Sequence, residues 1–589
     1  MIVPLVKMTF CGLLRDKAKI LTDLQNFGCL HIIPLRELPE ALRSVSPASD
    51  SREALRFLQE SPQKLRAYQD RKDFDPFQLE TQILELKARM QDLQEERDLL
   101  LGRLSELQPW GDFAFPDPED FGGLRLWFYA VPYRLLAHIP PDVVYEVVQR
   151  DNRQAYIVVL AAQEPANMPV ARVRVGKLSP HEMRRRLEEV EMALEDVQLE
   201  RTSLTRWRWL LEQSLARLED ETALTHAALV SLTEEPLFAL QAWAPAAQQA
   251  DLLAYAQAKG LVCEVVPPDP QETPPTLLRN HPRIASGQDL VCFYKTPGYW
   301  EWDPSAVVLI SFSIFFAMIM ADAGYALLLA AVLGLSWRRL GASETGRWWR
   351  DFAAIVLSFS TLYGILVNSY FGLSFPPGTW PAALHLLDLH DFNLMMGLSV
   401  SIGVTHLLLA HACQAYVRRG SLVMLAPLGW IGIFLGAVGY FLGSLGHGPE
   451  LLLTGGLAFM ITGALGVLFF TSGEGTLWQR LLGGLQGLAG AVTGFGDTLS
   501  YLRLFALGLA SASLADNFNM LAQNAKAAYP ALGLLFAALI AILGHGINLL
   551  LAIASGFIHG LRLNFIEFFN WSLGEEGIPF HAFRRKEKL

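Results

Sequence analysis

DTLSYLRLFALGLASASL, residues 497–514, places one arginine, Arg503, in the middle of an apolar stretch. A second arginine, Arg562, stands in a similar setting in SGFIHGLRLNFIEFF, residues 555–569. An arginine at the centre of a membrane helix costs about 2.5–3.5 kcal/mol on insertion scales, so it usually faces protein or water and marks an ion or substrate path. The two stretches therefore predict a membrane protein that uses both arginines.

The composition of the chain divides it into two halves. The 589 residues are 52% hydrophobic and 18% charged; residues 1–300 hold most of the charge, whereas residues 305–570 contain repeated apolar runs of spanning length. A net charge of −10 with no basic tract gives no reason to propose nucleic-acid binding. The start, MIVPLVKMTFCGLLRDK, lacks the features of a signal peptide, so we expect the first half in the cytoplasm.

The sequence carries no motif for catalysis or metal binding. Its five cysteines are scattered without CxxC spacing, which argues against a disulfide framework and a zinc site. No GxxxxGK[ST] loop, no GxGxxG after a strand, and no HExxH, GxSxG or Ser/His/Asp arrangement stands out. We expect no catalytic residues, no cofactor and no metal in this chain.

Two heptad seams mark long helices in the first half. Both have the period of a coiled coil, and the helices would be about 45 Å and 55–60 Å long. The first seam consists of Leu79, Ile83, Leu86, Met90, Leu93, Arg97, Leu100, Leu104 and Leu107, and the second of Met183, Leu187, Val190, Leu194, Val197, Arg201, Leu204, Arg208, Leu211, Leu215 and Leu218.

Strand-like segments lie between and around the seams. LRLWFYAV and AYIVVLAA separate them, so we expect an antiparallel coiled-coil hairpin of about 78–108 with 180–220, a distal α/β lobe at about 110–178, and Leu93 near the Leu204–Leu211 region. LVKMTFCGLL, GCLHIIPL and LFALQAWAP predict a proximal α/β lobe from 1–70 and 230–270. Two helices of an ordinary bundle are the alternative, although they leave the strand-rich insert unexplained.

The second half has eight candidate spans. They lie at about 305–321, 324–337, 352–375, 392–416, 421–444, 450–471, 483–523 and 531–571. The first two are short and joined through MADAGY, so a single long helix is the alternative there. The last two would be roughly 60 Å long against a hydrocarbon core of about 30 Å, so they must tilt, bend or project. The fold class is mainly α, a cytoplasmic coiled-coil hairpin arm with α/β lobes plus a polytopic helical membrane domain of about eight spans.

The basic residues predict the orientation of these spans. They follow every second span and are nearly missing from the other loops, with Lys526 as the exception, so the positive-inside rule places both termini in the cytoplasm. These residues are Arg338, Arg339, Arg347, Arg350, Arg418, Arg419, Arg480, Arg584, Arg585, Lys586 and Lys588.

Each membrane arginine lies on a stripe of polar or small residues. Steps of three and four from Arg562 reach His559, Ser555, Ala552, Asn548 and His545, and from Arg503 they reach Ala506, Ala510, Ser513 and Asn517, or Ser500, Gly496 and Thr493. A water-filled half-channel along the Arg562 stripe is one interpretation, since a neutral histidine can both accept and donate a proton. The alternative is close helix packing with interhelical hydrogen bonds, and arginines that snorkel to an interface.

A guanidinium in the membrane suits one part of a proton path. It stays protonated and so does not relay protons, but it can drive the proton off a nearby carboxylate and raise a barrier to cations. Within this chain, Asp497 or Glu567 is the candidate fixed partner of the arginines.

The chain resembles the membrane stator subunit of rotary V/A-type ATPases, called subunit a in eukaryotes and subunit I in prokaryotes. The resemblance covers essentially the whole chain, and YGILVNSYFG at 363–372 resembles the prokaryotic form. Its motifs are GFGDTLSYLRLFALGLA at 494–510, GHGINLLLAIASGFIHGLRLNFIEFF at 544–569, MADAGYA at 320–326, PPTLLRN at 274–280 and FYKTPGYWEWDPS at 293–305.

The resemblance implies partners and site residues. The partners would be a ring of proteolipid subunits with membrane carboxylates, peripheral stalk subunits, a central-stalk adaptor subunit and membrane lipid. Arg503 and Arg562 would meet the ring carboxylate, and His559 stands at a position that is polar in the family. Position 552, a glutamate of the proton path in eukaryotic relatives, is Ala here, so the residues expected to compensate are His545, Asn548, Asp516 and Glu567.

The expected function is that of a non-catalytic, proton-translocating stator subunit in the inner membrane of a prokaryotic cell. Residues 1–300 would form the cytoplasmic arm, 301–575 the membrane domain and 576–589 a basic cytoplasmic tail. Two other classes stay open. A secondary transporter would use the arginines to bind an anionic substrate, although no inverted repeat is visible, and a membrane-anchored coiled-coil scaffold would not need charges at membrane depth.

Overall fold

The computed structural model describes residues 1–36, 49–71, 73–113, 122–173, 175, 178–379, 381–445, 450–472, 476–528 and 532–586. Residues 37–48 of the expected proximal lobe, 114–121, 174, 176 and 177 of the distal lobe, and Lys588 of the tail lie outside the described residues. The chain forms two compact units, which are described separately. One consists of Met1–Gly12, Cys29–Ile33 and Ala239–Ala582, and the other of Leu13–Gly28, Pro34–Phe238 and Phe583–Leu589.

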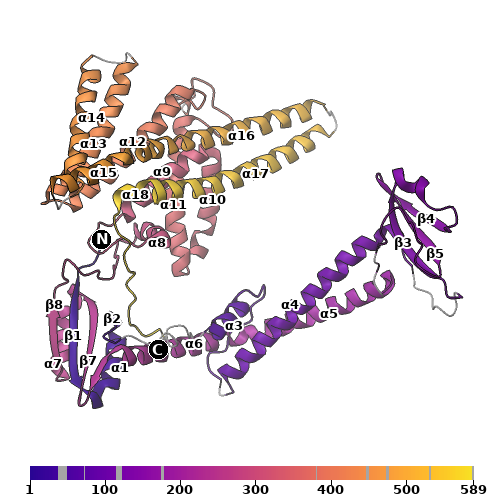
Figure 1. The fold of residues 1–589 in the computed structure, drawn as a ribbon, viewed down its shortest axis with the longest axis horizontal. Coiled ribbons are helices and arrows are strands. Elements are labelled where there is room, and N and C mark those ends of the chain that lie inside the picture. Colours follow the sequence, from indigo (N-terminus) through magenta and orange to yellow (C-terminus); the bar gives the residue numbers. More distant parts are fainter. Residues whose placement is uncertain are drawn as a thin grey trace. The chain divides into compact units, whose positions relative to one another are not determined.

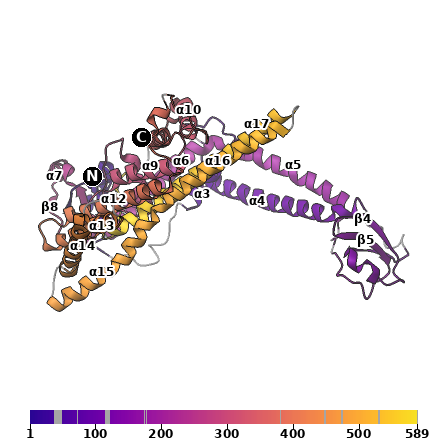
Figure 2. The ribbon, with the colours of Figure 1, turned by 90° about the horizontal axis from the view of Figure 1, so that it is seen from above.

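The second unit contains the coiled-coil hairpin. Helix α4 (Pro76–Leu107) and helix α5 (Pro180–Leu204) run side by side and end at a lobe with the sheet order β3-β5-β4 (Figures 1 and 2). Asp75 caps α4 and Ser179 caps α5 in a capping box with Glu182, which satisfies the free amide groups at both helix starts. The lobe strands are β3 (Arg125–Pro132), β4 (Tyr145–Arg150) and β5 (Gln154–Ala161), all antiparallel.

The register of the hairpin differs from the expected one. Arg186 Nε bonds to Glu96 Oε1 at 2.7 Å, and Gln82 Nε2 bonds to Glu200 Oε1 at 3.3 Å. These contacts place Leu93 level with Val190 rather than beside Leu204–Leu211, so that expectation is wrong.

The second seam is not one continuous helix. A 3-10 turn at Thr205–Trp207 separates α5 from α6 (Arg208–Val230). The buried Thr205 hydroxyl donates to the Thr202 carbonyl at 2.6 Å and accepts from the Leu65 amide at 3.0 Å, and such local bonding competes with a regular helix. Helices α1 (Lys17–Phe27) and α3 (Ser49–Gln59) pack on α6, so part of the expected proximal lobe belongs to this unit.

The first unit begins with a small sheet. Its strands β2 (His31–Ile33), β7 (Leu237–Pro245), β1 (Leu5–Leu13) and β8 (Val262–Val266) lie in that order, and helix α7 (Gln249–Ala258) follows β7 in the chain. β1 pairs antiparallel with β8, and β2 with β7, so the strands near residue 1 and those near residue 250 share one sheet.

The rest of the first unit is helical. Six helical segments of the described residues are long and apolar enough to cross a membrane, and α9 is a shorter apolar helix. The helices are α8 (Ala285–Tyr294), α9 (Ser305–Met320), α10 (Ala323–Leu340), α11 (Glu344–Val367), α12 (Phe392–Val417), α13 (Leu425–Ser444), α14 (Glu450–Phe470), α15 (Leu477–Ser500), α16 (Leu502–Ala528), α17 (Gly533–Arg562) and α18 (Phe569–Ser572). The fold class is therefore confirmed as mainly helical and polytopic, with a span count close to the expected eight.

The two short apolar stretches form two helices, not one. Ala321 ends α9 in the left-handed conformation with φ 48°, and the Asp322 side chain caps α10 by accepting the Tyr325 amide at 3.0 Å. The helix is therefore interrupted within MADAGY, and the chain changes direction there.

The last two apolar stretches pack together and bend. α16 and α17 run side by side (Figures 1 and 2). The first of these two stretches bends at Tyr501, between α15 and α16. The second continues from α17 into a π-helical segment, Leu563–Phe568.

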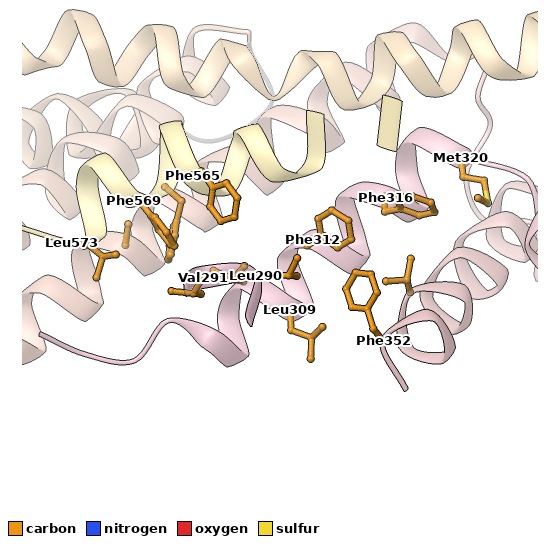
Figure 3. Close-up of a cluster of buried hydrophobic side chains, with 14 of the residues drawn as sticks. Leu290, Val291, Leu309, Phe312, Phe316, Met320, Phe352, Phe565, Phe569 and Leu573 are labelled. Atoms are coloured by element: carbon orange, nitrogen blue, oxygen red, sulfur yellow. The ribbon is translucent and has the colours of Figure 1, made fainter. Parts of the chain in front are cut away.

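Helix α9 packs against the last helical segment. Phe312 and Phe316 of α9 belong to one buried cluster with Phe352 of α11 and with Phe565 and Phe569 of the last segment (Figure 3). Gly556 permits this contact, because a Cβ there would lie 2.6 Å from the Phe316 ring. The end of α17 therefore packs on an aromatic core, which fixes the position of its last residue, Arg562.

Candidate functional site

The two membrane arginines converge on one glutamate. Arg503 Nη2 lies 3.6 Å from Glu567 Oε1, and Arg562 Nε lies 3.9 Å from the same oxygen. The Glu567 side chain is 2% exposed, whereas the side chains of Arg503 and Arg562 are 22% and 52% exposed. A buried carboxylate with two guanidiniums between it and the surface leaves one positive charge for a further partner.

The π-helical segment brings Glu567 to the arginines. A π-helix bonds residue i to i+5, so the residue five positions after Arg562 lies one turn above it, where an α-helix would place the fourth. The Asn564 side chain donates to the Gly560 carbonyl at 2.9 Å and accepts from the Ser311 hydroxyl at 2.5 Å. In an α-helix the Gly560 carbonyl would accept the backbone amide of Asn564. Here the Asn564 side chain donates to that carbonyl instead.

Three polar atoms of this cluster have no hydrogen-bond partner among the described residues. They are Arg503 Nη1, Glu567 Oε2 and His559 Nδ1, all inaccessible to solvent. Buried polar atoms normally have partners, and exceptions deserve a functional explanation. His559 lies one turn before Arg562 on α17, so the unpaired atoms are gathered where the two guanidiniums meet.

A second polar cluster lies nearer the N-terminal end of α17. Tyr325 Oη lies 2.7 Å from His545 Nδ1 and accepts from Asn548 Nδ2 at 3.1 Å. Asn548 also donates to the Ser511 carbonyl of α16 at 2.9 Å, and His545 Nε2 lies 3.1 Å from Asn519 Oδ1. The cluster therefore joins α10, α16 and α17 by hydrogen bonds.

Asp322 anchors the loop beside this cluster. Its Oδ1 accepts the amides of Tyr325 and Phe371 at 3.0 and 2.9 Å, and its Oδ2 accepts from Ser369 Oγ at 2.7 Å and the Gly372 amide at 2.9 Å. With four donors this carboxylate is fully satisfied, so its position fixes Tyr325.

The predicted site residues fall into three groups. Arg503, Arg562, Glu567 and His559 form the arginine cluster, and His545 and Asn548 belong to the second cluster. Asp497 accepts a hydrogen bond from Trp571 Nε1 at 2.6 Å, so Glu567, not Asp497, is the carboxylate between the arginines. Ser555 and Asp516 are half-buried, and no hydrogen bond within the described ranges joins either to the two clusters.

The stripe predicted from Arg503 is largely the open face of α16. Ala506, Ala510 and Asn517 are exposed, while the opposite face buries Leu504, Phe505, Gly508, Ser511 and Ala515. The stripe predicted from Arg562 is not one open face. Asn548 and Ala552 are buried, and Arg562 is exposed. The residues facing outward along α17 include Ile547, Leu550 and Ile558.

The sequence patterns missed Tyr325, Asn519 and Ser511. Tyr325 lies in MADAGYA, and only its contact with His545, 220 residues later, gives it a role. No group of three or more His, Cys, Asp or Glu residues that could hold a metal occurs in the part of the chain that the structure describes.

Known proteins resemble this chain over much or all of its length. The V-type ATP synthase subunit I of Chlamydia pneumoniae is 28% identical over 419 residues, which cover 60% of this chain and 62% of that protein. V-type ATP synthase subunit I 1 of Treponema pallidum is 26% identical over an alignment that covers 100% of both chains. The chain is thus similar to the subunit I proteins of V-type and A-type ATP synthases.

Two other comparisons add no support for this similarity. No family model matches the sequence. A crystal structure of the cytoplasmic N-terminal domain of subunit I, a homolog of subunit a of V-ATPase, has 14% identity and a TM-score of 0.21, covering 44% of this chain and 99% of that one. The similarity to subunit I therefore rests on the sequence relatives.

Proposed function

We propose that this chain is the membrane stator subunit of a rotary V/A-type ATP synthase and is not itself catalytic. ATP hydrolysis or synthesis takes place on other subunits, and this chain guides protons past a rotating ring of proteolipids. In this proposal residues 1–300 form the cytoplasmic arm, 301–575 the proton-translocating domain and 576–589 the basic tail.

The convergence of Arg503 and Arg562 on the single carboxylate of Glu567 carries the proposal. Two guanidiniums and one carboxylate leave a net positive charge on the open side of α16 and α17, which calls for an anionic partner at membrane depth. The small residues Ala506 and Ala510 on the same face of α16 allow another helix to approach closely. A ring carboxylate arriving on this face meets that charge.

The proton path has two halves separated by the arginines. A proton enters one half-channel, neutralises the ring carboxylate and leaves through the other half-channel after the guanidiniums favour the ionised form. His559, with Nδ1 unpaired, is the residue placed to exchange a proton near Arg562. His545 and Asn548, whose side chains are bonded to Tyr325, line the far end of one half-channel, and Ser555 lies between the two ends.

The arm and the tail serve the assembly. The α4–α5 hairpin holds peripheral stalk subunits against torque, and the central-stalk adaptor subunit contacts the cytoplasmic side. The arginines at the end of α10, the start of α11, just after α12 and at the start of α15 support cytoplasmic termini by the positive-inside rule, and we assign the chain to the inner membrane of a prokaryotic cell.

The test is Arg503→Ala in the complete complex, reconstituted into vesicles. We expect no ATP-driven acidification, although the complex assembles, and near-complete loss for Arg503→Lys, because lysine lacks the planar fork and loses its proton more readily when desolvated. The matched control is Lys526→Gln, which removes an exposed cation from the same helix. Pumping at the wild-type rate by Arg503→Ala would refute the assignment.

Purification distinguishes this proposal from a secondary transporter and from a scaffold. Only a stator requires a proteolipid ring, so the ring should remain with the chain in mild detergent. An isolated chain that transports an anion, or an assembly without proteolipid, would support one of the two alternatives.

A further inference from the structure

An open groove between α10 and α11 lies away from both polar clusters. It has a volume of about 230 Å³ and is lined by Ala330, Leu333, Gly334 and Trp337 of α10 and by Ala354, Leu357, Ser358 and Thr361 of α11. The helices are antiparallel neighbours, so Trp337 and Ala354 lie at one end of the groove and Ala330 and Thr361 at the other. Seven residues of helix give it a length of about 10 Å.

The groove is mostly apolar and lies beside exposed side chains. The hydroxyl groups of Ser358 and Thr361 donate to the carbonyls of Ala354 and Leu357, at 2.7 and 2.8 Å, so its two polar side chains are used within the helix. Large apolar side chains beside it are exposed, with Leu335 at 87% and Leu362 at 57%. A surface of this kind fits a hydrocarbon chain.

One end of the groove is strongly basic. Arg338 and Arg339 follow Trp337 in the last turn of α10, and Arg347 and Arg350 lie at the start of α11. The Arg350 guanidinium stacks 4.5 Å from the centre of the Trp337 ring and pairs with Asp351 at 2.8 Å. Arg347 Nη1 donates to the Gly341 carbonyl at 3.4 Å, so these side chains gather at the turn between the helices.

We propose that this groove binds one anionic phospholipid, with an acyl chain between α10 and α11 and the phosphate on the arginines of the turn. Charge complementarity selects this occupant. Between residues 338 and 351 the four arginines Arg338, Arg339, Arg347 and Arg350 stand against two carboxylates, Glu344 and Asp351, so the turn has a net charge of +2. Basic pockets between membrane helices bind anionic headgroups. Trp337 stands between the two parts, as aromatic residues do at a membrane interface.

The groove exists because Gly334 has no side chain. A Cβ at Gly334 would meet no atom within 4 Å, so a larger residue there fits the helix and fills the groove. Gly455 on α14 is equally open, so Gly455→Leu is a matched control for Gly334→Leu.

The experiment uses the full chain in its purified complex and a phosphatidylglycerol with a photoreactive acyl chain. We expect labelling of α10 and α11, competed by unlabelled phosphatidylglycerol and not by phosphatidylcholine. Arg338→Gln and Arg347→Gln should each raise the lipid concentration for half-maximal labelling about fivefold, because each arginine near a charged surface contributes on that scale. Gly334→Leu should abolish the labelling.

The control variants keep the inference falsifiable. Arg418→Gln with Arg419→Gln removes two arginines from another loop of the same predicted side, and it should leave labelling of α10 and α11 unchanged. Equal competition by phosphatidylcholine, insensitivity to Arg338→Gln, or labelling of a neighbouring subunit that covers the groove would each overturn the proposal. None of these results depends on proton pumping.

Discussion

Glu567→Gln is the substitution that tests the arginine cluster most directly. Glutamine keeps the size of the side chain and removes its charge, so the two guanidiniums lose their internal counter-ion. At 3.6 and 3.9 Å, each ion pair is worth about 4–5 kcal/mol at an effective dielectric constant of 20, before desolvation.

The effect on folding should be moderate. Burying the carboxylate, which is 2% exposed, costs several kcal/mol, and the two attractions offset this cost. Arg562 is half exposed, so its share is screened by solvent. Because both guanidiniums keep some contact with solvent, we expect a loss of about 3 kcal/mol in the free energy of unfolding, at the low end for a broken buried pair, and an assembled complex.

The effect on proton flux should be larger and should depend on pH. A ring carboxylate beyond the guanidiniums would lie about 8 Å from Glu567, where a unit charge contributes about 2 kcal/mol at the same dielectric constant. Removing this negative charge favours the ionised ring carboxylate. The pH of half-maximal flux should therefore move about 1.5 units lower.

The assay is proton flux per assembled complex in vesicles, measured with a pH-sensitive dye from pH 5 to 9. Glu567→Asp retains the charge and should restore most of the wild-type profile, whereas a merely structural role would make it resemble glutamine. Glu450→Gln removes an exposed carboxylate at the start of α14 and serves as the control. A Glu567→Gln profile that overlays the wild-type profile would refute the electrostatic role.

Three further predictions address other parts of the chain. Tyr325→Phe removes the hydroxyl that contacts the histidine and asparagine of the second cluster, and it should slow proton flux several-fold without loss of assembly; unchanged flux would return that cluster to a packing role. Arg201→Met should lower the free energy of unfolding of the arm by about 1–3 kcal/mol, measured by denaturant titration, because the buried guanidinium donates to the Phe57 carbonyl at 2.6 and 3.1 Å and the substitution leaves that acceptor unpaired; equal stability would contradict this. Burial raises the pKa of Glu219, but hydrogen bonds from Lys586 and Arg52 outweigh this effect and leave the pKa below its usual value. The contact therefore stabilises the fold above about pH 4.5, and this stabilisation is lost as the pH falls through the lowered pKa. The difference in melting temperature between wild type and Lys586→Met should vanish in acid.

The sequence predicts that Arg503 and Arg562 are functional residues, because a charge in an apolar membrane stretch is costly wherever it lies. It offers Glu567 only as one of two candidate partners, beside Asp497, since α-helical periodicity places Ile566, not Glu567, one turn after Arg562. The π-helical segment depends on Asn564, whose bond to Ser311 joins positions 253 residues apart. Such a contact leaves no periodic signal.

The same limit applies to the arm. The heptads of α4 and α5 identify two helices that bury apolar seams, and Leu86 and Val190 are buried as the pattern requires. Heptads repeat, however, so sliding one helix by seven residues preserves the pattern. The register is instead fixed by polar contacts such as Arg186 with Glu96, and by the turn at Thr205 that ends α5.

The charge balance at the end of α17 separates a stator from a scaffold. A scaffold that retained two arginines for packing would need two internal counter-charges, because an unpaired charge in the membrane costs several kcal/mol. Among the described residues only Glu567 lies within 4 Å of either guanidinium as an ion pair, so one positive charge has no internal partner. The small-residue face of α16, with Ala506 and Ala510 exposed, lies on the stripe of Arg503. The missing negative charge and the space for a closely packed helix thus occur on the same surface, and a helix that carries a carboxylate satisfies both.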